Sequence, residues 1–140
     1  MDKIPSFNKN HDIICPGFYL STTDRDLTTF DLRFIKPNCG KYISNAAMHS
    51  IEHILATILR NSSYKDSIVY FGPMGCRTGF YLITRDLDFD TVKNLIIKCI
   101  KDALEITTVP GAERKECGNY KEHNLSAAKM HLKKYLRYLV

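Results

Sequence analysis

The chain has 140 residues, a hydrophobic fraction of 44% and a formal net charge of +5 at pH 7. A chain of this length is typical of one domain, and we expect a single domain over residues 1–140. No apolar run approaches the roughly 18 residues that a membrane-spanning helix needs. Residues 1–10 also lack the charged and then apolar pattern of a secretory signal. We therefore expect a soluble, cytoplasmic protein that has no membrane partner.

The positive charge is concentrated near the C-terminus, on Lys129, Lys133, Lys134 and Arg137. These residues are interleaved with apolar side chains, a pattern typical of a solvated helix face. A basic helix would also suit nucleic-acid binding. However, the rest of the chain has no basic stripe and no aromatic RNA-binding motif, so we expect no nucleic-acid partner.

The chain has five cysteines: Cys15, Cys39, Cys76, Cys99 and Cys117. Their number is odd, their spacings are irregular, and no two of them form a Cys-x-x-Cys pair. In a reducing compartment such thiols serve as core residues, metal ligands or catalytic groups rather than as disulfides. Cys99 falls on the apolar side of a predicted helix, and we interpret it as structural.

The predicted elements begin with strands and turns over residues 1–40. Residues 28–35 alternate apolar and polar side chains with the period of a half-buried strand, and residues 37–40 have turn composition. A helix capped by Ser44 or Asn45 is predicted to run to about Asn61. Residues 67–71 and 78–84 predict two strands, because they are rich in β-forming residues. A tight connection containing two glycines and a proline joins them.

A second helix, capped by Asp88 or Asp90, is predicted to run through Leu104. Pro110-Gly111 breaks the chain, residues 113–119 form a polar loop, and a third helix begins near Asn124. The order of strand, helix, strand, strand, helix, helix favours an α+β fold. We expect an antiparallel sheet packed against helices in a single-domain sandwich.

The sharpest local motif is His49-Ser50-Ile51-Glu52-His53, inside the first predicted helix. Residues four apart lie one above the other on a helix, so His49 and His53 can bind one metal ion from the same side. Glu52 falls between this pair and the apolar stripe, where a partly desolvated carboxylate can carry protons. An ordinary amphipathic helix with two half-exposed histidines gives the same pattern, so the motif alone leaves both interpretations open.

Two cysteines lie in unusual settings. Cys117 is in a polar loop before a glycine, and its thiolate would complete a His₂Cys set with an open position for substrate oxygen. Cys76 lies in a glycine-containing turn beside Arg77, where backbone N–H groups and a guanidinium favour the thiolate. A thiolate there can act as a base or a nucleophile. Each cysteine taken alone is also compatible with an unreactive buried thiol.

Five segments in this order resemble the family of S-ribosylhomocysteine lyases, the LuxS enzymes. The segments are Ser6-Phe7 with His11, the strand 30–34, the helix motif 49–53, the loop 73–81, and Glu116-Cys117-Gly118 with His123. The chain departs from the family at Ser50, where threonine is common. It also departs at Tyr70 and Gly72, where aspartate and serine often precede the Pro-Met-Gly stretch. None of these three positions is a candidate ligand or proton carrier.

The resemblance implies that His49, His53 and Cys117 bind a metal ion, with Glu52 and Cys76 as catalytic proton carriers. It implies Fe²⁺, one ion per subunit, which Zn²⁺ or Co²⁺ often replaces on handling. The fold implied is the same single domain, assembled as a homodimer with two equivalent sites near the subunit interface.

The resemblance also implies that Ser6, His11 and Arg33 contact substrate, with Ser6 and His11 reaching across from the other subunit of the homodimer. Arg33 would supply a fixed charge, either for substrate or for keeping Cys76 ionised. The alternative for Arg33 is an ordinary surface ion pair with Asp31 or another acid.

The implied reaction converts S-ribosylhomocysteine to homocysteine and dihydroxypentanedione, the precursor of autoinducer-2. The sugar carbonyl must move along the chain until it lies β to the thioether carbon, after which β-elimination expels homocysteine. A Lewis-acidic metal would stabilise negative charge on the sugar oxygens. Cys76 would remove and return carbon-bound protons, and Glu52 would shuttle protons among oxygens.

Two other classes of protein compete with this interpretation. Inverzincin peptidases also carry His-x-x-Glu-His on a helix, with the glutamate activating water. This chain is short, however, and offers a cysteine rather than a glutamate as the third ligand. A metal-storing or basic nucleic-acid-binding module is the non-enzymatic alternative, and it would leave Cys76 and Glu52 without a role.

Overall fold

The computed structural model, which describes residues 1–140, is built on a four-stranded antiparallel sheet in the order β1-β2-β4-β3. The strands are β1 (Gly17–Asp24), β2 (Leu27–Arg33), β3 (Ile68–Pro73) and β4 (Gly79–Arg85). The alternation predicted for residues 28–35 is confirmed, because Phe30, Leu32 and Phe34 belong to the hydrophobic core while Asp31 and Arg33 between them make polar contacts. The sheet therefore has an apolar face and, at its centre, a polar one.

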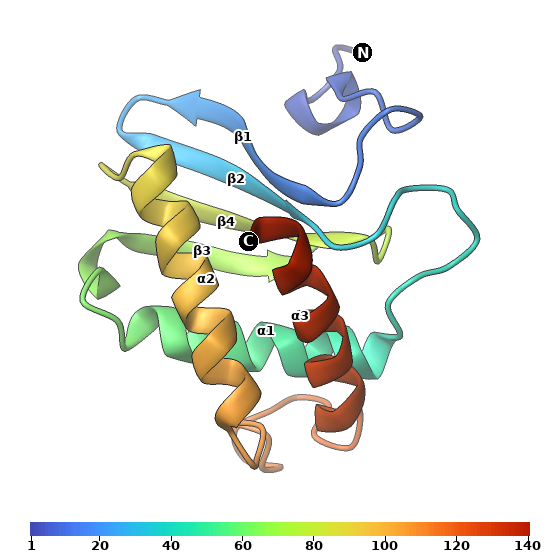
Figure 1. Ribbon diagram of the computed structural model, residues 1–140, viewed down its shortest axis with the longest axis vertical. Helices are drawn as coiled ribbons and strands as arrows, with labels where there is room; N and C mark the ends of the chain where they lie inside the picture. Colours follow the sequence, from blue (N-terminus) through green and yellow to red (C-terminus); the bar gives the residue numbers. More distant parts are fainter.

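Three helices, α1 (Asn45–Arg60), α2 (Phe89–Glu105) and α3 (Leu125–Leu139), pack on the apolar face of the sheet (Figure 1). The first two begin at a predicted cap, and the third begins next to Asn124, where its start was predicted. The side chains of Ser44, Asp88 and Asn124 accept hydrogen bonds from the backbone N–H three residues on, at 3.2, 2.8 and 2.9 Å. Caps of this kind contribute about 1 kcal/mol each. The predicted α+β fold in one domain is confirmed, and none of the helices has the length and apolar character needed to span a bilayer.

The sequence patterns did not locate β1, so the predicted order contained one strand too few before the first helix. Phe18, Tyr19 and Leu20 are adjacent apolar residues with no two-residue alternation, and they are followed by small polar residues. The strand lies at the sheet edge, and its register with β2 shifts between Leu20 and Thr22. A bulged edge strand is half exposed, so it needs no regular alternation, and β1 is held by pairing with β2.

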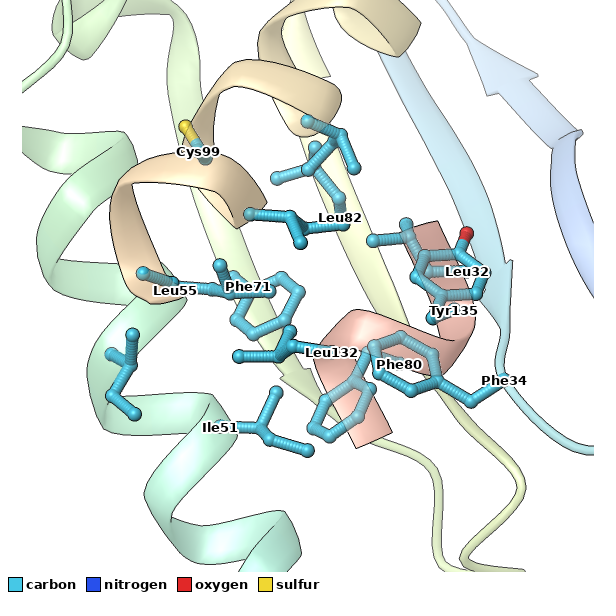
Figure 2. Packing of buried hydrophobic residues seen from close by; sticks show 14 of the residues in the cluster. Leu32, Phe34, Ile51, Leu55, Phe71, Phe80, Leu82, Cys99, Leu132 and Tyr135 are labelled. Atoms are coloured by element: carbon cyan, nitrogen blue, oxygen red, sulfur yellow. The ribbon is translucent and has the colours of Figure 1, made fainter. Parts of the chain in front are cut away.

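The hydrophobic core lies between the sheet and the helices, as Figure 2 shows. Side chains from the strands and from α1 and α3 meet there, among them Leu32, Ile51, Leu55, Phe80, Leu82 and Leu132. Tyr135 of α3 stacks on Phe34 with ring centroids 4.0 Å apart and donates its hydroxyl to the carbonyl of Gly17 at 2.9 Å. Cys99 is 1% exposed, and burial raises the pKa of its thiol to about 11, which confirms its structural role.

The polar face of the sheet is covered by the N-terminal segment, residues 1–16, which includes the short 3-10 helix η1 (Pro5–Asn8). Lys9 from this segment forms an ion pair with Asp31 of β2. Asp31 is fully buried and also pairs with Arg33, which is 1% exposed. The N-terminal segment thus encloses a charged group at the centre of the sheet, next to the loop that carries Cys76.

Candidate active site

His49 and His53 lie on the exposed side of α1, where the loop between α2 and α3 brings Cys117 against them. Sγ of Cys117 is 3.4 Å from Nε2 of His49, and the ligand atoms of these three residues and His123 all lie within 4.8 Å of one another. Zinc bonds of about 2.1 Å to nitrogen and about 2.3 Å to sulfur, at a tetrahedral angle, would separate the two ligand atoms by about 3.6 Å. The cluster therefore has the spacing that one divalent cation requires.

The hydrogen bonds of His49 and His53 leave the metal-facing nitrogens free. Nδ1 of His49 lies 2.8 Å from the carbonyl oxygen of Glu122, and Nδ1 of His53 lies 3.0 Å from that of Pro110. A carbonyl only accepts, so each Nδ1 carries the proton and each Nε2 keeps its lone pair. Metal-ligating histidines in general donate their other nitrogen in this way. The same two bonds fasten the two ends of the loop to α1.

Gly111 allows this loop to lie close to His53. Its φ is +66°, and a Cβ built there would meet Nδ1 of His53 at 3.4 Å. A residue with a side chain at this position would be strained in its backbone, and its Cβ would touch the ring of His53. Cys117 is held at the far side of the loop, where its N–H donates to the carbonyl of Glu113 at 3.0 Å, and its side chain is buried.

His123 is the member of this cluster that the sequence motifs did not assign to the site. Its ring stacks on that of His49 with centroids 3.9 Å apart, and its Nε2 lies 3.6 Å from Sγ of Cys117. Its Nδ1 lies 3.1 Å from Oγ of Ser50, within the helix motif. Burial lowers the pKa of His123, and the neighbouring His49 and His53 lower it further. The sequence signal was its position six residues after Cys117, just before the cap of α3.

Cys76 lies at the tip of the connection between β3 and β4, which is fixed to the start of α1. The N–H of Arg77 donates to the carbonyl of Met74 at 3.0 Å, and the carbonyl of Arg77 accepts from the N–H of Ile43 at 3.0 Å. Arg77 has a φ of +60°, an uncommon conformation for a residue with a side chain. At Gly79 a Cβ would meet the carbonyl oxygen of Leu32 at 2.3 Å, so this approach of the two strands requires glycine.

A chain of hydrogen bonds connects Cys76 to the buried ion pair. Sγ of Cys76 is 3.1 Å from Oγ1 of Thr78, which accepts a bond from Nη1 of Arg33 at 2.9 Å. The other nitrogens of Arg33 donate to both carboxylate oxygens of Asp31, at 3.1 and 2.6 Å. Arg33 does pair with Asp31, but the pair is buried and not at the surface as the alternative interpretation had it. Its guanidinium has no exposed part, so it reaches Cys76 through Thr78.

Glu52 and the Cys76 loop face one cavity of about 260 Å³ beside the histidine cluster. Its lining includes His49 and Glu52 from α1 and Gly75 and Arg77 from the connection between β3 and β4. Glu52 is half buried, whereas Cys76 is exposed. A larger hollow of about 770 Å³ between α1 and α2 contains none of the candidate site residues. The smaller cavity thus lies between α1 and the connection that carries Cys76, although neither Cys76 nor Cys117 is among its lining residues.

Ser6 and His11 lie in the N-terminal segment, on the polar side of the sheet. Ser6 lines a hollow of about 220 Å³ together with Tyr81, and Nδ1 of His11 lies 3.0 Å from the carbonyl oxygen of Lys9. Neither residue lines the cavity that Glu52 lines. Within one chain, the structure thus brings together His49, His53 and Cys117, and separately Cys76 with Arg33, while Ser6 and His11 contact neither group.

The fold and the site define a class: a small α+β protein with a His/Cys cluster spaced for a divalent cation, next to a glutamate and an exposed thiol. Residues 4–139 match the family model described as S-ribosylhomocysteinase (LuxS). This chain belongs to the LuxS family.

Relatives with the name S-ribosylhomocysteine lyase are similar over nearly the whole chain. The protein of Borreliella burgdorferi (strain ZS7) is 47% identical, covering 99% of this chain and 93% of its own. That of Finegoldia magna is 46% identical, covering 97% and 90%. That of Porphyromonas gingivalis is 41% identical, covering 98% and 91%. The likeness therefore includes every segment that carries a candidate site residue.

Proposed function

We propose that this protein is a carbon–sulfur lyase that cleaves S-ribosylhomocysteine to homocysteine and dihydroxypentanedione, the precursor of autoinducer-2. The observation that carries this proposal is the convergence of His49, His53 and Cys117 in a chain that belongs to the LuxS family. The substrate and products differ by no atoms and no net electrons, so every proton removed in the reaction is given back. The protein must therefore supply groups that both accept and donate protons.

The proposed metal ligands are His49, His53 and Cys117, with one divalent ion per chain. Fe²⁺ is the proposed active ion, and Zn²⁺ or Co²⁺ would fit the same donors. When bound, the metal would act as a Lewis acid toward the sugar oxygens and so favour movement of the carbonyl along the ribose chain. Two imidazoles and a thiolate leave a coordination position for substrate, as a catalytic site requires.

Cys76 is the proposed base that removes a carbon-bound proton and returns it to the neighbouring carbon. Its sulfur is exposed and contacts Thr78, whose hydroxyl oxygen is already occupied by a hydrogen bond from Arg33. The hydroxyl proton of Thr78 is then free to point at the sulfur. Arg33 would in this way hold a positive charge near Cys76 from a buried position.

Glu52 is the proposed carrier of protons between oxygens and the acid–base group for the elimination step. It lies one residue from the proposed ligand His53 and lines the cavity that Gly75 also lines. A half-buried carboxylate next to a cation can exchange protons with hydroxyl groups of a bound sugar. Homocysteine would leave when the carbonyl has reached the position β to the thioether carbon.

We also propose a homodimer in the cytoplasm, with Ser6 and His11 contacting substrate in the site of the other subunit. Apolar side chains of the N-terminal segment support a partner surface: Ile4, Phe7 and Ile13 are 52%, 67% and 69% exposed. All five cysteines are free, which is typical of a reducing compartment. Residues 1–140 would form one catalytic domain.

The test of the proposed function is an anaerobic assay with S-ribosylhomocysteine, in which released homocysteine is measured with a thiol reagent. The metal content of the same sample is determined in parallel. We expect thiol release that Cys76→Ala reduces by at least about 10³-fold while metal content is retained. Cleavage of a peptide without release of thiol would instead support the peptidase class. Full turnover in the Cys76→Ala protein would rule out Cys76 as the base.

The shared site is tested by mixing two inactive variants. His11→Ala and Cys76→Ala chains, each inactive alone, would form mixed dimers in which one site has both residues intact. Activity should return on mixing, up to about a quarter of that of the unmodified protein for random exchange. Sedimentation gives the size of the assembly independently. A monomer, or a mixture that stays inactive although mixed dimers have formed, contradicts a site built from two subunits.

A further inference from the structure

The cluster contains one more possible ligand than the proposed metal site uses. His123 has Nε2 3.6 Å from the cysteine sulfur, close to the 3.4 Å that separates His49 from the same atom. Distance alone does not distinguish the two histidines. A fourth protein ligand would close the coordination sphere, as in structural zinc sites, and leave no position for a sugar oxygen. The role of His123 therefore decides what the site can do.

Ser50 lies between the backbone of Asn124 and the Nδ1 atom of His123. Oγ of Ser50 accepts a hydrogen bond from the backbone N–H of Asn124 at 2.8 Å and lies 3.1 Å from Nδ1 of His123. A hydroxyl has one proton to donate, and Nδ1 is the acceptor placed to receive it. With Nδ1 accepting, the ring proton is on Nε2. That nitrogen then has no lone pair for a metal, and its N–H points toward Cys117.

The two helix histidines are held in the opposite way. Nδ1 of His49 and Nδ1 of His53 each face a backbone carbonyl, an acceptor, so these rings carry their proton on Nδ1. The three histidines therefore differ in the groups that contact their Nδ1 atoms, although their ligand atoms belong to one close cluster. Carbonyl oxygens, which only accept, face Nδ1 of His49 and His53, whereas a hydroxyl that can donate faces Nδ1 of His123.

We propose that His123 is a positioning residue that donates a hydrogen bond from Nε2 to the thiolate of Cys117 and is not itself a metal ligand. The proposal rests on the metal site of the proposed function and goes beyond it by assigning the fourth member of the cluster. The bond withdraws charge from the sulfur, so the cation remains a stronger Lewis acid, and the proton on Nε2 keeps the remaining coordination position open.

Ser50 is the residue that would orient His123 for this hydrogen bond. It is fully buried within α1, and its hydroxyl also accepts the N–H of Asn124, the residue that caps α3. One side chain therefore fixes both the start of α3 and the tautomer of His123. Threonine carries the same hydroxyl, so Ser50→Thr would preserve the arrangement, whereas Ser50→Ala removes the donor to Nδ1.

The test uses the full-length protein loaded with Co²⁺, without substrate, so that it is independent of the proposed reaction. The energy of the thiolate-to-cobalt charge-transfer band reports charge on the sulfur. The change of the visible cobalt bands on adding azide reports an open coordination position. The variants are His123→Leu, which removes the donor, and His123→Gln, whose amide N–H can replace it. Ser50→Ala and Ser50→Thr form the second pair.

We expect azide to change the cobalt spectrum of both the unmodified protein and His123→Leu. In His123→Leu the charge-transfer band should move to lower energy and the Co²⁺ affinity should fall about 10- to 100-fold, with one ion still bound at saturation. His123→Gln should restore the band. Ser50→Ala should shift it in the same direction as His123→Leu, and Ser50→Thr should not, which decides the question even if His123→Leu does not fold.

Two results overturn the proposal. If azide affects His123→Leu but not the unmodified protein, His123 is a ligand whose removal opens the site. If neither His123→Leu nor Ser50→Ala moves the charge-transfer band, the hydrogen bond to sulfur does not exist. A protein that releases no homocysteine but gives the expected spectra would contradict the proposed function and leave this assignment intact.

Discussion

The histidine cluster and the thiol network lie near the same cavity, but they are built by different means. The cluster joins α1 to the loop between α2 and α3, and hydrogen bonds from two histidine rings to backbone carbonyls hold that loop in place. The thiol network starts at Cys76 and ends on a fully buried carboxylate in the centre of the sheet. The histidine cluster is thus assembled from segments at the surface, whereas the thiol network is part of the central sheet.

This difference implies that the histidine cluster mainly affects metal binding, whereas the thiol network mainly affects the stability of the fold. A loop held by a few contacts gains much of its order from a bound cation, because binding stabilises the arrangement that binds. A buried ion pair has the opposite character, since removing one partner leaves an uncompensated charge in the interior. We therefore expect changes in the cluster to reduce metal affinity at little cost in stability. Changes in the network should reduce stability at little cost in metal affinity.

The largest expected effect is the loss of metal from Cys117→Ala. Its side chain is one of the three proposed ligands, so the metal content should fall from one ion per chain to nearly none after dialysis. Cys76→Ala is the matched control, because it removes the other site thiol and should keep its ion. Metal analysis of both proteins gives the answer. A full complement of metal in Cys117→Ala would remove this residue from the ligand set.

Asp31→Asn should have the next largest effect, this time on stability. Asp31 is fully buried and accepts bonds from both Arg33 and Lys9, so the change leaves two cations without their counter-charge. We expect the free energy of unfolding to fall by about 3–5 kcal/mol in denaturant titrations, with metal stoichiometry unchanged. Asp26→Asn breaks the exposed pair with Arg85 and should cost less than about 1 kcal/mol. Equal losses in the two variants would show that burial of the pair is irrelevant.

Thr78→Val tests the link between the framework and the thiol. The variant keeps the shape of the side chain but removes the hydroxyl between Arg33 and Cys76. We expect alkylation of Cys76 by iodoacetamide at pH 7 to slow about tenfold, because the sulfur loses the hydroxyl that contacts it. Stability should fall by about 1–3 kcal/mol, because Arg33 loses an acceptor. Thr78→Ser should alkylate at the original rate, and an unchanged rate in Thr78→Val would mean that the hydroxyl does not act on the sulfur.

The sequence predicted those features of the fold and site that depend on short spacings. The caps at Ser44 and Asp88, the start of α3 near Asn124 and the alternation in β2 follow from residues within a few positions of one another. The side-by-side placement of His49 and His53 follows from the helix period, and their rings lie with centroids 4.7 Å apart. These local rules act before tertiary structure is known, so single-sequence reasoning captures them.

The features that the sequence missed depend on contacts between distant segments. Ser50 and His123 are 73 residues apart, and no local pattern links a hydroxyl in one helix to a ring before another. Arg33 and Thr78 are 45 residues apart and meet because β2 pairs with β4. The burial of Asp31 depends on the N-terminal segment lying over the sheet. The two histidines that can bind a metal could be found from their spacing. The groups that orient their rings could be found only from the structure.

The smallest effect that separates the two regions comes from two glycine substitutions, one in the loop that carries Cys117 and one elsewhere in the chain. Gly111 and Gly40 both have a positive φ, +66° and +82°, so alanine should strain either backbone and cost about 1 kcal/mol of stability. At Gly40 a Cβ meets nothing within 4 Å, whereas at Gly111 it meets Nδ1 of His53 at 3.4 Å, beside the bond to Pro110. Gly111→Ala should therefore also weaken metal binding, by up to about tenfold, while Gly40→Ala should not. Competition with a chelator measures both affinities. If the two variants bind metal equally well, the loop does not hold His53 in its ligating orientation. The histidine cluster would then not depend on the loop in the way that the thiol network depends on the sheet.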